Sequence, residues 1–284
     1  MALHLQLRRW YVGLHGLATL RGWPYEDAEL AEARMRIMRE LIGGPIGPDA
    51  AEVRIVVELD VDEAYDAWAD TYDEPNPLIM NEETALRSLL AALPRGLAAD
   101  VGAGTGRIAA ELVSLGHRVI AIDGSSRMLE RARVRVRDAS LLRAELDFLP
   151  LADGSVDLIV CGLALTHRED LERSLRGFAR IVRPGGYVVT SDVHPMAVAL
   201  GGQAFFRRAD GSRAVARNHV HWPSAYVRAA AAAGLAIDTC EEPVVTEEIL
   251  DAWGADDLFL GPETAMLGLP FSILWVFRKP FAMG

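Results

Sequence analysis

The chain has 284 residues, of which 51% are hydrophobic, and a formal net charge of −11. This length suits one large α/β domain with additions, or two small domains. Proteins that bind a phosphate backbone normally have a basic surface, so the negative charge disfavours a nucleic-acid partner. No apolar run is long enough to span a membrane, and Cys161 and Cys240 lie in apolar stretches typical of buried free thiols. We therefore expect a cytoplasmic protein with no membrane partner.

Residues 1–60 are expected to form an N-terminal helical arm or cap, followed by one larger domain at residues 61–284. Ala28 to Ile42 has apolar residues at helical spacing, and Gly43-Gly44-Pro45 ends this pattern. Residues 52–59 fit a short strand or a helix. The predicted helix could cover an active site, contact a second subunit or pack on its own domain, so both a monomer and a homodimer remain open.

From residue 97 onward the pattern alternates between strands and helices. Helices are expected at 107–115, 125–136, 169–182 and 223–233, and strands at 97–101, 118–123, 140–145, 156–161, 187–191, 235–240 and 271–277. Such alternation predicts an α/β fold with a Rossmann-like, seven-stranded, mostly parallel sheet and helices on both faces. Residues 196–222 interrupt it around the turn Ala209-Asp210-Gly211, which predicts a hairpin inserted after the fifth strand on the substrate side.

A glycine-rich loop, Asp100-Val-Gly-Ala-Gly-Thr-Gly106, follows the first of these strands. Its glycines allow the backbone to turn tightly and to lie against a ligand. A dinucleotide-binding loop would place its third glycine where this chain has Arg107, and a phosphate-binding P-loop needs a lysine that is absent here. Asp100, Asp123 and Asp147 end three successive predicted strands, so together they outline a nucleoside site.

These motifs resemble those of the class I S-adenosylmethionine-dependent methyltransferases, particularly the small-molecule branch. The resemblance rests on residues 100–106, 119–129, 147–160 and 175–186, and it covers about residues 62–195. It implies S-adenosylmethionine as cofactor, S-adenosylhomocysteine as product, and methyl transfer to an oxygen or nitrogen of a small organic acceptor. An acceptor from bacterial secondary metabolism, such as an antibiotic, is the leading hypothesis.

The resemblance also implies roles for individual residues. Those expected to bind the cofactor are Tyr72, Asp100, Gly102, Ala103, Gly104, Asp123, Gly124, Met128, Asp147, Phe148, Cys161 and Gly162. Tyr65, Trp68 and Tyr72 share one face of a predicted helix, and similar enzymes carry such a Tyr-Asp-rich helix before their core. Aromatic residues at this spacing also form core, but the resemblance favours a lid, with Tyr65 and Trp68 near the substrate.

Histidines are the candidates for a general base, which methyl transfer to an O–H or N–H group can require. His167 and His194 follow the fourth and fifth strands at the ligand edge, so both are predicted to be catalytic. His219, His221 and Trp222, at the end of the insertion, are predicted to contact the substrate. No metal is expected, although a two-histidine site with Asp192 is conceivable.

Two other functions remain open at this point. The first is transfer to carbon or to a protein acceptor, and the second is a non-methylating cyclase or binding protein built on the same fold.

Overall fold

The computed structural model describes residues 2–22, 28–43, 53–253 and 265–281. The chain divides into two compact units, Met1–Glu58 with Val244–Leu269, and Leu59–Pro243 with Pro270–Gly284. The sequence placed residues 244–269 in the larger domain, whereas in the structure they cluster with the N-terminal residues. Within the described ranges, no helix combines the length and the apolar character needed to cross a membrane.

The smaller unit contains the helices α1 (Leu7–Gly22), α2 (Ala28–Gly43) and α11 (Glu247–Trp253). Strands β1 (Ala2–Gln6) and β2 (Val53–Leu59) pair in an antiparallel arrangement. Arg21 of α1 donates hydrogen bonds to the carbonyl oxygens of Ala265 and Leu267, at 2.8 and 2.7 Å, and this joins the two segments of the unit. The predicted helix at 28–42 is present, and of the two alternatives left open for residues 52–59 the structure has the strand, at Val53–Leu59.

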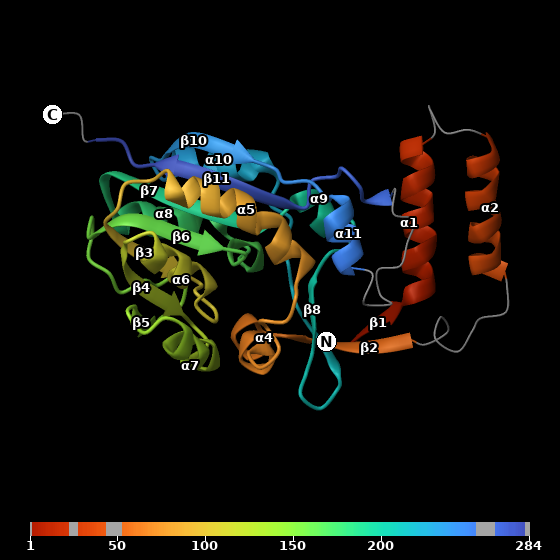
Figure 1. The fold of residues 1–284 in the computed structure, drawn as a ribbon, viewed down its shortest axis with the longest axis horizontal. Coiled ribbons are helices and arrows are strands. Elements are labelled where there is room, and N and C mark those ends of the chain that lie inside the picture. Colours follow the sequence, from red (N-terminus) through yellow and green to blue (C-terminus); the bar gives the residue numbers. More distant parts are fainter. Residues whose placement is uncertain (1, 23–27, 44–52, 254–264, 282–284) are drawn as a thin grey trace. The chain divides into compact units, whose positions relative to one another are not determined.

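The larger unit is built on a seven-stranded sheet with the order β10-β11-β7-β6-β3-β4-β5 (Figure 1). Its strands are β3 (Leu97–Val101), β4 (Arg118–Asp123), β5 (Ser140–Arg143), β6 (Val156–Gly162), β7 (Val182–Val193), β10 (Ala236–Glu241) and β11 (Ser272–Arg278). Strands β3 to β7 pair in parallel, and β11 is antiparallel to both β7 and β10. The predicted mostly parallel α/β sheet is confirmed.

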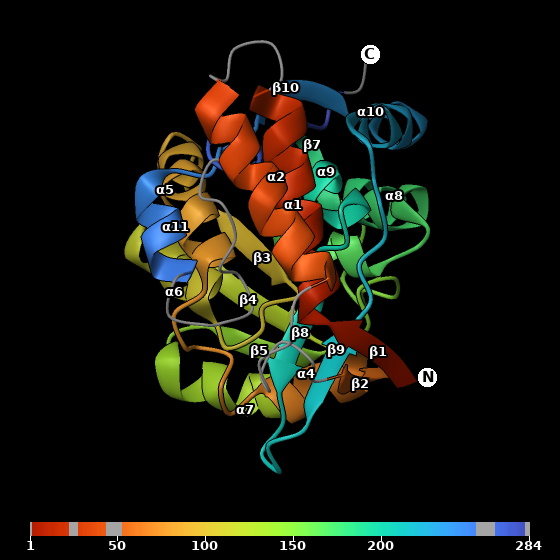
Figure 2. The ribbon, with the colours of Figure 1, turned by 90° about the vertical axis from the view of Figure 1, so that its right-hand side faces the viewer.

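Helices cover both faces of this sheet (Figure 2). On one face are α5 (Pro77–Ala91), α6 (Arg107–Ser114) and α7 (Ser126–Arg135); on the other are α8 (Leu171–Ile181) and α10 (Pro223–Ala232). Helix α5 begins at Pro77, a residue that fits the first turn of a helix because it has no amide hydrogen to leave without a partner. The side chain of Asn76 caps the helix by accepting a hydrogen bond from the Leu78 amide at 2.9 Å.

Two strand ends also differ from the prediction. Strand β5 ends at Arg143, two residues earlier than expected. Strand β7 begins at Val182, five residues before the predicted start at 187, and it includes Pro184-Gly-Gly186 close to an irregularity in its register with β6. The first of these differences changes which side chains face the ligand edge.

The inserted hairpin is present and packs on helix α4 (Val61–Trp68) (Figures 1 and 2). Its strands are β8 (Ala204–Arg207) and β9 (Arg213–Ala216), and the short helix α9 (Pro195–Ala199) precedes them. The Trp68 ring stacks on the Phe206 ring, with a centroid distance of 4.9 Å and an interplanar angle of 8°. This packing holds α4 beside the carboxyl edge of the sheet.

Candidate active site

The glycine loop connects β3 to α6 in a conformation that requires glycine. Gly102, Gly104 and Gly106 have φ angles of 73°, 54° and 85°, a region that other residues reach only at a cost. A Cβ atom on Gly102 would lie 2.8 Å from the Cβ atom of Ala164, so the space beside the loop admits backbone alone. The amides of Gly102 and Ala103 both donate to the Ile122 carbonyl oxygen, at 2.8 and 3.0 Å, which ties the loop to β4.

A pocket lies directly against this loop, and it brings together residues from several sequence motifs. Of the predicted site residues it is lined by Tyr65, Tyr72, Gly102, Gly104, Asp123, Gly124, Gly162 and His167. All of them belong to the larger unit. The structure therefore brings residues predicted from the loop and from α4 to one pocket, and their roles toward cofactor and substrate stay predictions.

Asp123, the last residue of β4, connects the loop to the next helix. Its Oδ2 atom accepts a hydrogen bond from the Gly104 amide and its Oδ1 atom accepts one from the Ser125 amide, each at 2.8 Å. Burial raises the pKa of the carboxyl group, and these two amides lower it. A carboxylate oxygen can accept more than one hydrogen bond, so Asp123 can also accept from the hydroxyl groups of a ribose.

Asp100 is fully buried at the end of β3, beneath the loop. Neither of its carboxylate oxygens has a hydrogen-bond partner of ordinary geometry in the described part of the chain. Burial raises its pKa to about 7, and the positive charge of Arg107 offsets this only in part. A buried carboxylate without a partner costs free energy. It fits a ligand that brings a cationic donor, as the ammonium group of a methionine moiety does.

Arg107 and Glu82 form a buried ion pair that the sequence analysis did not identify. The guanidinium group of Arg107, the first residue of α6, contacts the fully buried carboxylate of Glu82 on α5. Its positive charge also acts on Tyr72 and Asp100. An arginine directly after the glycine loop was the available signal, but its partner is distant in sequence.

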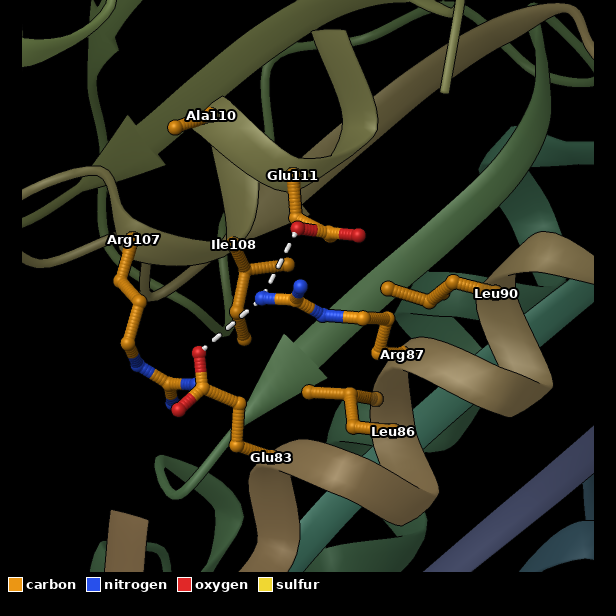
Figure 3. A pocket seen from close by; sticks show the side chains of 8 residues that line it. All are labelled: Glu83, Leu86, Arg87, Leu90, Arg107, Ile108, Ala110 and Glu111. Carbon is orange, nitrogen blue, oxygen red and sulfur yellow. Dashed lines mark hydrogen bonds and ion pairs between the residues drawn. The ribbon is translucent and has the colours of Figure 1, made fainter. Parts of the chain in front are cut away.

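A second pocket, of about 200 Å³, lies between α5 and α6 (Figure 3). Its apolar side includes Leu86 and Leu90. Arg87 crosses it and pairs with Glu83 and Glu111 at 3.3 and 3.4 Å. Because its charged groups satisfy one another, this pocket offers a ligand less than the site at the glycine loop.

Asp147 does not line the pocket at the loop. Its Oδ2 atom pairs with Arg168 at 2.7 Å and its Oδ1 atom accepts from the Ser174 hydroxyl at 2.9 Å. Since β5 ends two residues earlier than predicted, the pocket wall is instead made by Ala144, Glu145 and Leu146. A carboxylate at this strand end was predicted, but the lining residue is Glu145.

Glu145 faces a second carboxylate across the pocket. A hydrogen bond with the Asp62 side chain, together with burial, raises the pKa of Glu145. Both residues line the pocket, and Asp62 belongs to the first turn of α4.

His167 is the predicted base that the structure brings to the pocket. Its Nδ1 atom lies 2.8 Å from the carbonyl oxygen of Arg217, and its Nε2 atom lies 2.7 Å from the Tyr65 hydroxyl oxygen. A carbonyl oxygen only accepts, so Nδ1 carries the proton and Nε2 accepts the hydrogen bond from Tyr65. Burial lowers the pKa of His167 to about 4, and the ring is therefore neutral near pH 7.

The short 3₁₀ helix η1 (Leu165–His167) is held on both sides. The Thr166 amide donates to Oδ1 of Asp192 at 2.8 Å, and the His219 amide donates to the Thr166 carbonyl oxygen at 2.7 Å. The other oxygen of Asp192 accepts from the Tyr226 hydroxyl. Through these bonds β7, α10 and the end of the insertion fix the position of His167.

His221 and Trp222 do not line the pocket at the loop. They follow His219, whose amide helps to hold η1 in place. The Nε2 atom of His221 donates to the Arg168 carbonyl oxygen at 2.7 Å, and the His221 ring stacks with that of His219. Trp222 precedes α10 and half of its surface is exposed. The structure gives His221 a supporting contact, and substrate contacts by these three residues stay predictions.

His194 occupies the N-cap of α9. Its Nδ1 atom accepts from the Met196 amide at 3.2 Å, and its Nε2 atom lies 3.0 Å from Oε1 of Glu242. Both ring nitrogens are therefore engaged away from the pocket at the loop. The geometry favours His167 over His194 as a base.

The remaining predicted cofactor residues have mixed positions. Met128 and Cys161 are fully buried, and Ala103 is buried within the loop. Phe148 is exposed, and the Arg173 guanidinium lies 4.6 Å from its ring centroid. None of these four side chains lines the pocket.

Leu163 was not anticipated. Leu163 lines the pocket, and its φ angle is 54°. Among the described residues, no other non-glycine residue has a positive φ angle. The Leu163 amide donates to the Ser191 carbonyl oxygen at 2.7 Å. Such a conformation costs about 1–2 kcal/mol and is frequent at functional sites. Within the described ranges no group of histidine, cysteine or acidic side chains is arranged to hold a metal ion.

Comparisons with known proteins agree with this geometry. Residues 99–190 match the family model described as a methyltransferase domain. Malonyl-(acyl-carrier protein) O-methyltransferase from Yersinia pestis is 36% identical over 116 residues, which are 41% of this chain and 43% of that protein. The same enzyme from Pectobacterium atrosepticum is 32% identical over 154 residues, 53% of this chain and 59% of that protein. The matches thus span about half the length of these relatives.

Solved structures match a larger part of the chain. An S-adenosylmethionine-dependent methyltransferase from Mesorhizobium loti has a TM-score of 0.55 and 28% identity, and the match covers 70% of this chain and 98% of that one. The cyclase SpnF, at 16% identity and a TM-score of 0.58, shares the fold over 80% of this chain and 99% of its own. Residues 99–190 thus form a methyltransferase domain, and the glycine loop, the sheet order and the structural matches support the class I S-adenosylmethionine-dependent methyltransferase family for this chain.

Proposed function

We propose that this protein transfers a methyl group from S-adenosylmethionine to an oxygen or nitrogen atom of a small organic acceptor. The observation that carries the proposal is the buried Asp100 carboxylate, which has no hydrogen bond of ordinary geometry among the described residues. It lies beneath the glycine loop, and Gly102 and Gly104 of that loop line the same pocket as His167. When bound, S-adenosylmethionine supplies a methyl group that a positively charged sulfur already activates.

The described residues fit this cofactor at both of its ends. Asp100 can receive the ammonium group of the methionine moiety, and Asp123 can receive ribose hydroxyls. Gly102 and Gly104 leave the backbone open to close approach. We further propose that Glu145 and the Leu146 backbone, rather than Asp147 and Phe148, face the adenine, since only the former two line the pocket.

The protein's main contribution is to hold the acceptor in line with the methyl group, and such positioning is worth up to about 7–11 kcal/mol in intramolecular models. The His167 base assists acceptors that must lose a proton, an effect of roughly 10²–10⁴-fold. We propose an acceptor from bacterial secondary metabolism, because the aromatic rings of Tyr65 and Tyr72 in the pocket wall suit an organic molecule and the acidic chain does not suit a nucleic acid.

The test begins with titration calorimetry of the full-length protein with S-adenosylmethionine and S-adenosylhomocysteine. One site per chain is expected for both ligands. The protein is then incubated with candidate acceptors, and S-adenosylhomocysteine release and product mass are measured. No binding of either ligand would end the proposal, and turnover of an acceptor without S-adenosylhomocysteine release would favour a non-methylating scaffold instead.

A further inference from the structure

We propose that Tyr65 takes the proton from the methyl acceptor, that His167 acts through Tyr65, and that the acceptor is therefore a neutral O–H or N–H nucleophile rather than a carboxylate. The inference rests on the proposed methyl transfer and names the substrate class of that same site.

The first argument is the direction of the hydrogen bonds. The Arg217 carbonyl oxygen fixes the proton of His167 on Nδ1, which leaves a single lone pair on Nε2. The Tyr65 hydroxyl, 2.7 Å away, already donates to that lone pair. An acceptor therefore has no direct access to Nε2. The Tyr65 oxygen retains lone pairs, and these can only accept a hydrogen bond from a donor on the incoming molecule.

The second argument is that this pair is held in place. The rings of Tyr65 and His167 meet edge to face, with a centroid distance of 5.3 Å and an angle of 74°. Tyr65 also packs against Trp68 on the same helix and against Tyr72 in the turn that follows it, with centroid distances of 5.8 Å in both cases. Burial raises the pKa of Tyr65, as do the nearby charges of Asp123 and Asp192, so the phenol stays protonated and continues to donate to His167.

The third argument concerns charge. A carboxylate is already ionised near pH 7, so it needs no base, and its recognition calls for a cation. Arg168 lines the pocket, but it is paired with Asp147, and Arg107 is paired with the buried Glu82. The pocket wall also contains Asp62, Asp123 and Glu145. This arrangement opposes a second negative charge and is compatible with a neutral donor.

The proton and electron balance of the step is complete without another reactant. The acceptor's oxygen or nitrogen forms a bond to the methyl carbon as the carbon–sulfur bond breaks and leaves its electron pair on sulfur. The acceptor's proton passes to the Tyr65 oxygen while the Tyr65 proton passes to Nε2 of His167. The positive charge moves from sulfur to the imidazolium, whose Nδ1–H remains bonded to the Arg217 carbonyl oxygen.

The first experiment needs no acceptor. Full-length protein with ¹⁵N-labelled histidine is titrated by NMR in complex with S-adenosylhomocysteine, and His167→Asn assigns the signal among the seven histidines. We expect a neutral Nδ1–H tautomer from pH 8 down to about pH 5, consistent with burial and with the positive charge of Arg168 nearby. In Tyr65→Phe the Nε2 resonance should move, because its hydrogen-bond donor is lost. A proton on Nε2, or titration near 6.5, would overturn the pairing.

The second experiment tests the acceptor class. Binding of phenol and of benzoate to the same complex is compared by ligand-observed NMR, and phenol is expected to bind at least about tenfold more tightly. Equal binding of the two probes, or a preference for benzoate, would overturn the inference that the acceptor is a neutral O–H or N–H nucleophile. This outcome is separate from a failure of the proposed function, which would already appear as an absence of cofactor binding.

The third experiment uses an acceptor that the wild-type protein methylates. Tyr65→Phe and His167→Asn should each lower kcat by at least about tenfold, within the range of general-base effects, with the S-adenosylhomocysteine affinity within about threefold of wild type. The double variant should be no slower than the slower single variant, because one proton path is lost in each case. Tyr187→Phe, on β7 outside the site, is the control. Independent, multiplying losses would contradict action through Tyr65.

Discussion

Two titratable groups of the site, Asp100 and His167, satisfy their polar atoms in opposite ways. Neither oxygen of the buried Asp100 carboxylate has a hydrogen bond of ordinary geometry among the described residues, and burial raises its pKa more than the Arg107 charge and the Ala109 backbone lower it. At η1, His167 is bonded at both ring nitrogens, and the neighbouring Asp192 accepts from the Thr166 amide and the Tyr226 hydroxyl. Asp100 therefore needs a ligand to supply its hydrogen-bond donor, whereas the protein itself holds His167 in position.

Because of this difference, we expect changes at Asp100 to affect cofactor binding and changes at His167 to affect the turnover rate. A substitution that removes the Asp100 charge should weaken cofactor binding. It should also stabilise the ligand-free protein, because a buried carboxylate without a partner is no longer present. A change at His167 should alter turnover, because both of its ring nitrogens already have partners and are poised for one proton transfer.

The largest effect is expected for Asp100→Asn. Loss of the charged partner for the cofactor's ammonium should weaken S-adenosylmethionine binding by about 10–100-fold, since a hydrogen bond to a charged group is worth about 1.5–3 kcal/mol. In the folded protein the pKa of Asp100 is raised to about 7. Its contribution to stability is therefore present below the unfolded pKa near 4 and is lost as the pH rises through 7.

The same variant should consequently stabilise the ligand-free protein at pH 8 by about 2–4 kcal/mol, and by much less at pH 4. Urea unfolding at the two pH values, together with calorimetry, measures both effects. Asp153→Asn is the matched control, because Asp153 is exposed and pairs only at the surface with Arg180. Weaker binding accompanied by lower stability at pH 8 would contradict the account of an unpartnered carboxylate.

The sheet and the glycine loop were predictable because their signals are local. A glycine loop after an apolar strand, and an aspartate at the end of the next strand, occupy fixed places in a parallel α/β sheet. Gly102 and Asp123 line the pocket and Asp100 is buried beneath the loop, while their roles toward the cofactor stay predictions. The error at Asp147 arose from the boundary of one short strand. Strand β5 ends at Arg143, and a shift of two residues substitutes Glu145 for Asp147 in the pocket wall.

The base was predictable only as a set of candidates. His167 and His194 both follow strands, and nothing local distinguishes them. The difference comes from distant partners, since Tyr65 and Arg217 lie 102 and 50 residues from His167, and Glu242 lies 48 residues from His194. The Arg107–Glu82 pair was missed for the same reason. Hydrogen bonds between elements far apart in the sequence produce no periodic pattern of residues from which they could be predicted.

A smaller effect, confined to the glycine loop, is expected for Gly102→Ala. The φ angle of 73° is strained for alanine, and its Cβ atom would meet that of Ala164 at 2.8 Å. We expect destabilisation by about 2 kcal/mol or more, and roughly tenfold weaker cofactor binding. Gly211→Ala is the matched control. It has a φ angle of 81° with no atom near the added carbon, so it should cost only the conformational strain of about 1 kcal/mol and leave binding unchanged. Equal effects of the two variants would show that close packing at the loop is unimportant.

The smallest effect concerns the attachment of α4, the helix that carries Tyr65. Asp70 pairs with both Arg127 and Arg131 of α7 at 2.7 Å, and these side chains are exposed. Exposed pairs are weak and are screened by salt, so they can open when ligands enter or leave beneath α4. Asp70→Asn should raise the dissociation rate of S-adenosylhomocysteine by about two- to threefold at low salt, measured by stopped-flow fluorescence, and by little at 1 M salt. Glu172→Gln, which removes an exposed pair with Arg176 within α8, should change the rate at neither salt concentration. If the two variants behave alike, the attachment of α4 does not control ligand exchange, and the pocket must then be reached while α4 stays in place.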